Sequence, residues 1–365
     1  MIPTVCRPDE ILRLLPDALA GRAVLLPVKD SRDAEPLRPD LPVIEPGAAV
    51  IVTTSGSTGT PKGVVLSAAA LLASAGATRE RLGAAMRWYS PLPQHYVAGL
   101  MVLVRSLEAG TEPVLLASDL SDLPPADLAE PRALSIVPTH LHRALDDPET
   151  TGRLAAFDAV LLGGAPARPD LLDRARAAGI RVVTTYGMSE TSGGCVYDGV
   201  PLDGVDVLVD PNDGRISLAG PTLFSGYRLD PGLTAETLVG GRLLTHDRGV
   251  WQDGRLHVTG RIDDVVISGG VNVDLAEVQR HLALVDPHPG VVVGVPDQEW
   301  GTRIVLVTES GETDLALWRQ RLAGAGLARP ALPRQVVTVF RLPRTVSGKI
   351  DRQALVAAVT RTSTS

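Results

Sequence analysis

A stretch rich in glycine, serine and threonine, ending in a lysine, is the part of this sequence best suited to bind phosphate. It reads Thr53-Thr54-Ser55-Gly56-Ser57-Thr58-Gly59-Thr60-Pro61-Lys62-Gly63. Small residues let backbone N–H groups approach an anion, and the hydroxyls and the Lys62 ammonium supply further donors. The order Pro61-Lys62-Gly63 excludes the P-loop of GTPases and kinases, in which a Gly-Lys pair is followed by Ser or Thr.

Two further stretches place small and polar residues where apolar runs end. Leu161-Leu162-Gly163-Gly164-Ala165-Pro166 offers backbone against which a flat base can lie, although an ordinary strand-to-helix turn has the same composition. Thr185-Tyr186-Gly187-Met188-Ser189-Glu190-Thr191 brings an aromatic ring, hydroxyls and a carboxylate to the carboxyl edge of a parallel sheet, where ligands bind. Glu190 is a candidate magnesium ligand, and a solvated loop carboxylate is the alternative.

The second half of the chain adds a carboxylate, an arginine and a lysine. Asp247, in His246-Asp247-Arg248-Gly249, is suited to accept from the two hydroxyls of a ribose. Arg261, in Gly260-Arg261-Ile262-Asp263-Asp264, is suited to donate to sugar or phosphate. Lys349 lies in a glycine-containing turn, Ser347-Gly348-Lys349. Taken singly, each of these is more often only part of a solvated surface turn.

The elements that must position these residues follow from the apolar patterning. Apolar runs alternate with helical periods up to about residue 190, which predicts an α/β layered fold with a largely parallel sheet. The phosphate-binding stretch is predicted to be a strand-to-helix loop. Strands are expected at 48–52, 113–117, 133–137, 158–162 and 181–185, and helices at 68–82, 96–108, 139–146 and 168–178.

The pattern changes twice after this region. Between 195 and 260, Asn212-Asp213-Gly214 and Asp253-Gly254 punctuate short segments, which predicts antiparallel hairpins in a β-rich subdomain. After Arg261 a compact α+β unit is expected, with a glycine turn at Gly269-Gly270 and helices beginning after Asp274 and Asp351. We therefore expect a large N-terminal domain at 1–262 and a small, mobile C-terminal domain at 263–365.

Bulk properties narrow the class of protein. The 365 residues carry a net charge of −7, which argues against a nucleic-acid-binding surface. Two cysteines without a CxxC motif suggest neither a disulfide framework nor a structural zinc site. The N-terminal 20 residues contain no apolar run long enough for a signal peptide or membrane anchor. We expect a cytoplasmic enzyme, and assembly as a homodimer is a further expectation.

Together and in this order, these stretches resemble the acyl-adenylate-forming superfamily of acyl-CoA synthetases, adenylation domains and luciferases. The resemblance runs from about Val50 to Arg352. It implies ATP, Mg²⁺ and coenzyme A as ligands, Glu190 as the Mg²⁺ ligand and Lys349 as the catalytic lysine. It further implies phosphate contacts from Thr54, Ser55, Gly56, Ser57, Thr58, Gly59 and Lys62, adenine contacts from Gly163, Gly164, Ala165 and the segment Tyr186, Gly187, Met188 and Ser189, and ribose contacts from Asp247 and Arg261.

The chemistry of such enzymes explains why a second domain is needed. A carboxylate is a poor electrophile, so the acid attacks the α-phosphorus of ATP, pyrophosphate leaves, and cations stabilise the charge on the phosphate oxygens. Lys349 must then give way to a thiol. The resemblance implies rotation about a hinge at Asp263, which replaces Lys349 by a narrow coenzyme A channel at Ser268, Gly269 and Gly270.

Within the superfamily, the chain looks like the short o-succinylbenzoyl-CoA synthetases of menaquinone biosynthesis, particularly the actinobacterial kind. The resemblance is carried by the lead-in of only about 50 residues and by the segment 188–205. The expected acid pocket contains His95, Tyr96, Thr191, Ser192 and Gly193, and which of His95 and Tyr96 gates it stays open. Arg105 is a candidate for a second carboxylate, but an exposed helix arginine is the favoured interpretation.

Two alternatives stay open at this stage. The first is an adenylating enzyme that loads another acid onto coenzyme A or a carrier-protein thiol. The second is a nucleotide-binding sensor without catalysis, against which the intact Lys349, Glu190 and Asp247 argue, because binding alone does not require that lysine.

Overall fold

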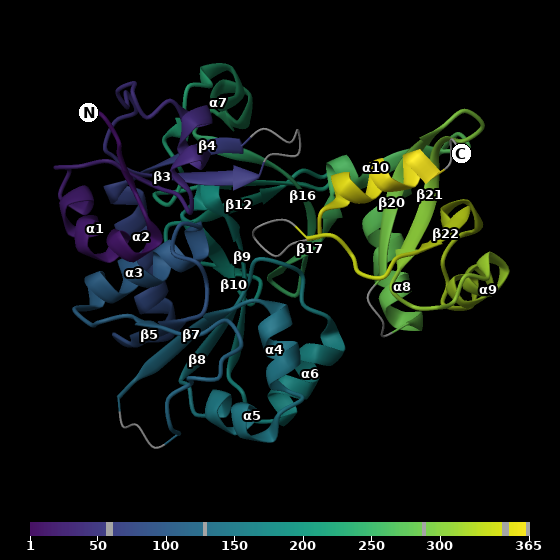
Figure 1. Cartoon of the computed structure of the whole chain (residues 1–365), viewed down its shortest axis with the longest axis horizontal. Coiled ribbons are helices and arrows are strands. Elements are labelled where there is room, and N and C mark those ends of the chain that lie inside the picture. The colour runs from purple at the N-terminus through teal and green to yellow at the C-terminus, as the bar shows by residue number, and fades with distance from the viewer. Residues whose placement is uncertain (56–60, 127–129, 287–289, 345–349, 363–365) are drawn as a thin grey trace. The chain divides into compact units, whose positions relative to one another are not determined.

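The structure is a computed structural model that describes residues 1–55, 61–126, 130–286, 290–344 and 350–362 (Figure 1). The chain forms two compact units. Unit 1 comprises Met1–Leu208, Ser217–Thr245 and Trp251–Leu256, and unit 2 comprises Val209–Ile216, His246–Val250 and His257–Ser365. Short 3-10 helices occur at Pro8–Glu10, Ser31–Leu37, Ser189–Thr191, Ile262–Asp264 and Arg329–Ala331.

A seven-stranded sheet is the centre of unit 1, with the order β11-β10-β9-β8-β7-β5-β6. Neighbouring strands from β9 to β6 pair in parallel, whereas β10 and β11 are antiparallel additions. This confirms the expected largely parallel sheet. The strands are β5 (Arg87–Ser90), β6 (Val114–Leu115), β7 (Arg132–Ile136), β8 (Ala159–Leu162), β9 (Val182–Met188), β10 (Gly193–Tyr197) and β11 (Val200–Pro201).

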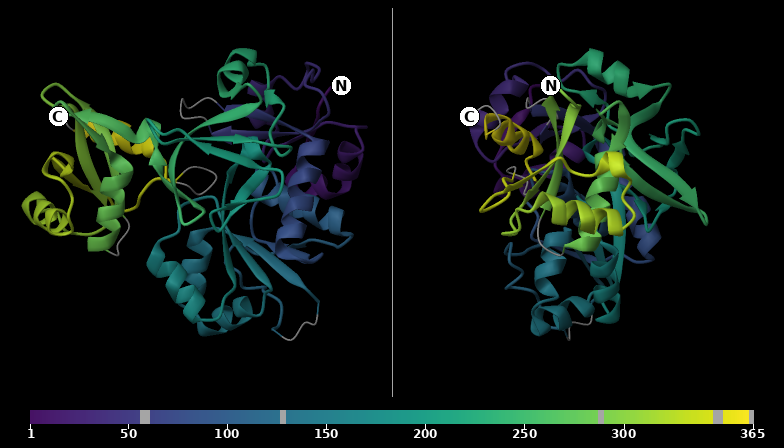
Figure 2. Two further views of the ribbon diagram at one scale, coloured as in Figure 1. Left: turned by 180° about the vertical axis from the view of Figure 1, so that it is seen from behind. Right: turned by 90° about the vertical axis from the view of Figure 1, so that its right-hand side faces the viewer.

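Helices cover both faces of this sheet because its strands are apolar on both sides. On β8, Val160 and Leu162 pack with α4, α5 and α6, while Ala159 and Leu161 pack with α2 and α3. The two groups of helices lie on opposite sides of the sheet in Figure 1 and in the view from behind in Figure 2. Their bounds are α2 (Ala68–Leu82), α3 (Val97–Ala109), α4 (Pro138–Ala144), α5 (Pro148–Ala155) and α6 (Pro169–Ala177).

A second sheet of unit 1 corrects one sequence-based expectation. Residues Pro61–Ser67 form a strand, β4, so the phosphate-binding stretch joins two antiparallel strands and is not a strand-to-helix loop. The reason is a second apolar run, Val64-Val65-Leu66, that is fully buried. Ser67 then caps α2 by accepting from the Ala70 N–H. The sheet order is β1 (Thr4–Cys6), β2 (Leu25–Pro27), β3 (Ala48–Ser55), β4 and β14 (Gly226–Tyr227), and α1 (Ile11–Leu19) packs nearby.

The β-rich region folds as predicted into antiparallel hairpins. Asp253 and Gly254, both at positive φ, form the turn between β16 and β17. Residues 210–214 likewise join β12 to β13. The elements are β12 (Asp206–Val209), β13 (Arg215–Ala219), α7 (Pro231–Thr237), β15 (Leu238–Val239), β16 (Arg242–Gln252) and β17 (Arg255–Arg261).

Unit 2 contains a sheet with the order β19-β18-β21-β20, in which β22 also pairs with β21. Alternate residues of β20 face α8 and α9 on one side and α10 on the other. The predicted elements after Arg261 are confirmed. They are β18 (Val265–Ser268), β19 (Val271–Asp274), α8 (Leu275–Val285), β20 (Gly290–Asp297), β21 (Gly301–Thr308), α9 (Leu315–Gly324), β22 (Gln335–Thr338) and α10 (Arg352–Thr362).

Among the described residues, the helices are too short or too polar to cross a lipid bilayer.

Candidate active site

The base of the phosphate-binding stretch is a tight strand pair. Thr54 lies opposite Lys62 in the register of β3 and β4. Gly63 is needed here, because a Cβ on it would lie 2.9 Å from the Cβ of Arg228 and 3.0 Å from the Ile51 side chain. Four predicted phosphate contacts, Gly56, Ser57, Thr58 and Gly59, lie outside the described residues.

The carboxyl ends of β8 and β9 bring the predicted adenine-binding residues together. Leu162 pairs with Thr184, so Gly163, Gly164 and Ala165 follow β8 beside the segment that leads to Tyr186. The two segments are in close contact, because a Cβ on Gly163 would lie 2.3 Å from the Thr185 Oγ1. Gly163 and Gly164 add no side chain to this edge, so their backbone can be approached closely by a flat ring.

The segment 189–193 is a tightly bonded turn. The Thr191 hydroxyl donates to the Gly193 carbonyl at 2.7 Å, and the Ser192 hydroxyl donates to the Thr222 carbonyl at 2.9 Å. Ser192 has φ 52° and Gly193 has φ 90°, and the Ser74 hydroxyl of α2 donates to the Ser192 carbonyl at 3.0 Å. The hydroxyls of Thr191 and Ser192 therefore shape the turn, and their contact with an acid stays a prediction.

Glu190 is held by a residue that the sequence interpretation missed. The Tyr227 hydroxyl donates to Glu190 Oε1 at 2.7 Å. Burial, followed by the neighbouring Glu190 carboxylate, raises the pKa of Tyr227, so its hydroxyl stays protonated and donates. The ring also lies 5.7 Å from the Lys62 Nζ. The only signal in the sequence was an aromatic residue after a glycine in Gly226-Tyr227.

The two candidate gate residues lie against each other before α3. The rings of His95 and Tyr96 are 4.2 Å apart between centroids. The His95 Nδ1 is buried and has no hydrogen-bond partner among the described residues. Burial, and then the nearby Lys29, lower the pKa of His95, which favours a neutral imidazole at pH 7. Which of the two residues gates the acid pocket therefore stays open.

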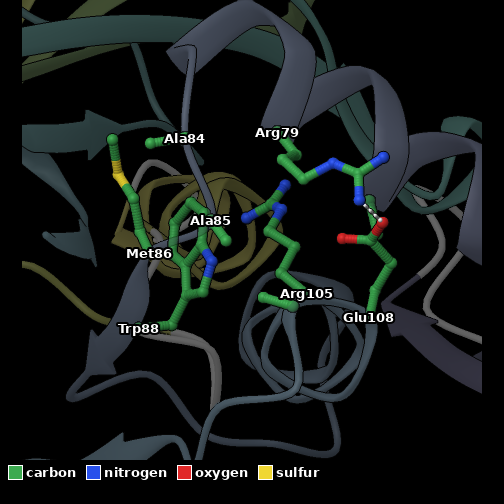
Figure 3. Close-up of a pocket in the computed structure, with 9 residues that line it drawn as sticks. Arg79, Ala84, Ala85, Met86, Trp88, Arg105 and Glu108 are labelled. Atoms are coloured by element: carbon green, nitrogen blue, oxygen red, sulfur yellow. Dashed lines mark ion pairs between the residues drawn. The ribbon is translucent and has the colours of Figure 1, made fainter.

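Arg105 is buried, which corrects the interpretation of an exposed helix arginine. Only 5% of its surface is exposed. Its guanidinium lies 4.9 Å from the Trp88 ring and donates to the Tyr197 hydroxyl at 3.3 Å, while its Nε has no partner among the described residues. Figure 3 shows it beside the ion pair of Arg79 and Glu108, whose atoms are 2.8 Å apart. The adjoining cavity of about 10 Å³ is large enough for about one water molecule.

A chain of hydroxyls connects Arg105 to the turn after Glu190. Tyr197, which accepts from Arg105, lies 3.0 Å from the Thr78 hydroxyl. Thr78 in turn donates to the Ser74 carbonyl at 2.8 Å, and Ser74 bonds to Ser192 as described above. The buried charge of Arg105 is thus connected by hydrogen bonds to the turn of the predicted acid pocket. All residues of this network belong to unit 1.

In unit 2 the predicted ribose and hinge residues form one cluster. Arg261 donates to both carboxylate oxygens of Asp263 at 2.7 Å and to Asp247 at 3.3 Å. Although burial raises the pKa of Asp263, the hydrogen bond and charge of Arg261 hold it below its ordinary value. Asp264 pairs with Arg352 at 2.8 Å at the start of α10. Asp247 and Arg261 are therefore in contact with each other, and their binding of a ribose stays a prediction.

The glycine turn of unit 2 borders a cationic cavity of about 390 Å³. Gly269 and Gly270 have φ 60° and 77°, and a Cβ on Gly269 would lie 3.0 Å from the Trp300 ring. The buried Ser268 hydroxyl has no partner among the described residues. The Arg334 guanidinium lies 3.8 Å from the centroid of Trp300. The cavity is lined by Ser268, Gly269, Val271, Trp300, Arg319, Arg329, Pro330 and Arg334.

The model of the AMP-binding enzyme family matches residues 13–228. The chain belongs to the AMP-binding enzymes. A relative, the probable 2-succinylbenzoate–CoA ligase of Mycobacterium tuberculosis (strain CDC 1551 / Oshkosh), is 44% identical over an alignment of 333 residues, and the match covers 86% of this chain and 85% of that protein.

Two solved AMP-binding enzymes share the fold. The o-succinylbenzoate CoA synthetase of Bacillus subtilis, in complex with the acyl-adenylate intermediate OSB-AMP, has a TM-score of 0.77 and 26% identity, covering 97% of this chain and 82% of that chain. ATP-bound MatB from Rhodopseudomonas palustris has a TM-score of 0.75 and 27% identity, covering 98% and 79%. ATP is thus bound in a structure that shares this fold.

Mg²⁺, which AMP-binding enzymes of this kind imply, fits the carboxylate that the structure offers. Glu190 is half-buried, and among the described residues only its Oε1 accepts a hydrogen bond, from Tyr227. Mg²⁺ is commonly held by one or two carboxylates together with substrate phosphates. Among the described residues no cluster of three or more His, Cys, Asp or Glu forms a metal site of its own. Lys349 lies outside the described residues, between the paired residues Arg344 and Ile350.

Proposed function

We propose that the protein is an ATP-dependent o-succinylbenzoate–CoA ligase of menaquinone biosynthesis. The observation that carries this proposal is the 44% identity to the mycobacterial relative across 86% of the chain. The reaction has two steps, formation of an acyl-adenylate with release of pyrophosphate, and transfer of the acyl group to the thiol of coenzyme A.

For the first step we assign the nucleotide to the residues of the strand ends and of the phosphate-binding stretch. Gly163, Gly164, Ala165 and the segment 186–189 hold the adenine, and Asp247 with Arg261 holds the ribose. The hydroxyls and N–H groups of 54–59 and Lys62 hold the β- and γ-phosphates. Their role is to compensate the charge that moves onto pyrophosphate as the bond to the α-phosphorus breaks.

Glu190 would hold Mg²⁺ through its second oxygen. The ion would neutralise phosphate charge when bound. Lys349 would bridge the attacking carboxylate oxygen and the α-phosphate, where negative charge builds up. Both groups act by position, since phosphoryl transfer needs charge stabilisation and alignment more than proton transfer.

For the acid, we propose that the turn 191–193 borders the reacting carboxylate and that Arg105 serves the second one. Arg105 is buried and forms no ion pair with a carboxylate in the part of the chain that the structure describes, and a buried cation is costly unless an anion approaches it. The contact is direct or passes through one water in the adjoining cavity. A monocarboxylic acid would leave this charge unmatched, which favours a dicarboxylate such as o-succinylbenzoate.

For the second step we propose that domain 263–365 turns about Asp263 and brings the turn Ser268-Gly269-Gly270 to the site. The cavity beside this turn contains three arginines and no carboxylate among its lining residues. That composition suits the phosphate groups of coenzyme A, and the Trp300 ring offers a surface for its adenine.

The proposal is tested by mass spectrometry of the products. The protein is incubated with ATP, Mg²⁺, coenzyme A and o-succinylbenzoate, in parallel with a panel of benzoates and fatty acids. A coenzyme A thioester formed preferentially from o-succinylbenzoate is expected. Pyrophosphate release with a different acid would show that o-succinylbenzoate is not the substrate, and no turnover with any acid would refute catalysis.

A further inference from the structure

The short strand β14 connects the two charged parts of the phosphate side of the site. Tyr227 pairs with Val64 of β4. On one side of it, the Arg228 N–H donates to the Gly63 carbonyl at 2.7 Å, and on the other, the Phe224 N–H donates to the Glu190 carbonyl at 2.8 Å. The backbone therefore fixes Tyr227 relative to both Lys62 and Glu190.

The Tyr227 side chain contacts both charges at once. Its hydroxyl donates to Glu190 Oε1 at 2.7 Å, and its ring lies 5.7 Å from the Lys62 Nζ. Within the described residues, Lys62 and Glu190 form no ion pair within 4.0 Å. Tyr227 is 8% exposed and packs edge-on against Phe224 with 4.9 Å between the ring centroids, so the ring has little freedom to move.

A similar trio elsewhere in unit 1 behaves differently. Arg87 lies 6.0 Å from the Tyr89 ring, and the Tyr89 hydroxyl is 3.5 Å from Glu130. There the cation and the carboxylate pair directly at 2.9 Å. A tyrosine beside two opposite charges does not by itself keep them apart, so the arrangement at Tyr227 is specific to its geometry.

We propose that Tyr227 is a positioning residue that keeps Lys62 and Glu190 from pairing with each other. A direct pair would neutralise both groups and occupy the donors and oxygens that bind phosphate and cation. With the hydroxyl on Oε1, Glu190 keeps its second oxygen for Mg²⁺, while the ring attracts the Lys62 ammonium and leaves its N–H groups for phosphate. This inference rests on the proposed function of the site.

Two substitutions separate the two contacts, and isothermal titration calorimetry with ATP measures each, with Mg²⁺ and with EDTA. Tyr227→Phe keeps the ring and removes the hydroxyl, so affinity for MgATP falls about tenfold while affinity for metal-free ATP stays unchanged. Tyr227→Leu removes the spacer as well, so Lys62 pairs with Glu190 and metal-free ATP also binds about tenfold more weakly.

A rescue distinguishes this role from a general loss of structure. In Tyr227→Leu with Glu190→Gln, no carboxylate competes for Lys62, so affinity for metal-free ATP returns toward that of the wild type. In a Glu190→Gln background, Tyr227→Phe has no further effect on MgATP binding. This second comparison tests the proposal even if the leucine variant fails to fold. Tyr89→Phe is the matched control, with unchanged ATP binding.

The proposal is overturned if Tyr227→Phe binds MgATP as the wild type does, or if its loss persists in the Glu190→Gln background. Wild-type protein that binds no MgATP would instead refute the proposed function. The two failures are therefore distinguishable in one set of titrations, without measurement of turnover.

Discussion

Replacing Arg105 by methionine tests whether the buried charge of α3 serves substrate or fold. Methionine keeps an unbranched apolar stem in place of the arginine stem and removes the guanidinium with its charge, so most of the packing around the stem is retained. The polar contacts of the Arg105 guanidinium among the described residues are one hydroxyl at 3.3 Å and one aromatic ring, and the ion pair of Arg79 and Glu108 lines the same cavity. We expect Arg105→Met to leave folding nearly intact and to impair recognition of the dicarboxylate.

The cost to stability follows from those contacts. The hydrogen bond contributes about 0.5–1.5 kcal/mol, and the contact with Trp88 about 0.5–2 kcal/mol. Against this, the substitution removes a buried cation and an Nε that have no carboxylate partner and no acceptor within the described ranges, and their burial costs about 1–3 kcal/mol. The free energy of unfolding is therefore expected to change by less than about 2.5 kcal/mol, as the balance of these terms.

Arg132 is the matched control for stability. It is 2% exposed, but its guanidinium donates to the carbonyls of Pro125, Ala126 and Ala156 at 2.7–3.2 Å. Arg132→Met would leave those carbonyls without a donor, at a cost of at least about 3 kcal/mol. Urea denaturation of the two variants compares the free energies of unfolding.

The cost to function is measured by steady-state kinetics with o-succinylbenzoate and with benzoate. A lost charge-assisted hydrogen bond of about 1.5–3 kcal/mol corresponds to a rise in KM of about 10- to 100-fold for the dicarboxylate. The small rate with benzoate should not change. An equal effect on both acids, or a destabilisation as large as that of Arg132→Met, would refute the assignment.

Three further predictions follow from the same structure. Lys349→Ala should nearly abolish adenylation but spare thioester formation from supplied acyl-adenylate, and equal loss of both half-reactions would contradict its role. Gly63→Ala should destabilise unit 1 by about 1–3 kcal/mol through overpacking, because the new Cβ meets Arg228 at 2.9 Å; urea denaturation measures this, with the exposed Gly311→Ala, which meets nothing within 4 Å, as control. Burial raises the pKa of Cys6 and of Cys195 to about 12 from 9.0, so neither should react with a thiol reagent at pH 8 until the protein unfolds. Because the unfolded thiols lose their protons first, the free energy of unfolding should fall as pH rises from 9.0 toward about 12, and a flat profile would contradict this.

The sequence predicted those helices and strands that contain a clear apolar pattern of their own. Helix α2 was expected at 68–82 and spans those residues, because Ser67 caps its start and Gly83 ends it. Strands β6, β7, β8 and β9 of the parallel sheet and the elements after Arg261 were also found where their runs lie, whereas β5 was missed because Arg87-Trp88-Tyr89-Ser90 is short and has polar ends. Strand β4 was missed because Val64-Val65-Leu66 is only three residues long, and α5 because Pro148-Glu149-Thr150-Thr151 is polar.

Residues that act through a partner distant in sequence were harder to predict. Arg105 was interpreted as exposed, because no property of α3 alone shows that Trp88 and Tyr197 enclose it. Tyr227 was missed because its partners, Lys62 and Glu190, are 165 and 37 residues away. Local patterns predict strands, helices and loop chemistry, but only the folded chain shows which distant side chains meet.

The position of Gly193 against α3 has a consequence for how the substrate range of this protein can be altered. A Cβ on Gly193 would lie 3.3 Å from the Met101 side chain, one helical turn before Arg105. The described residues that we assign to the nucleotide lie on strands or directly after them, whereas α3 supplies Met101 and Arg105 to one side of the proposed acid site. We expect that substitutions along α3 can exchange one acid for another without disturbing the binding of ATP, which makes α3 the natural element to randomise in a selection for new substrates.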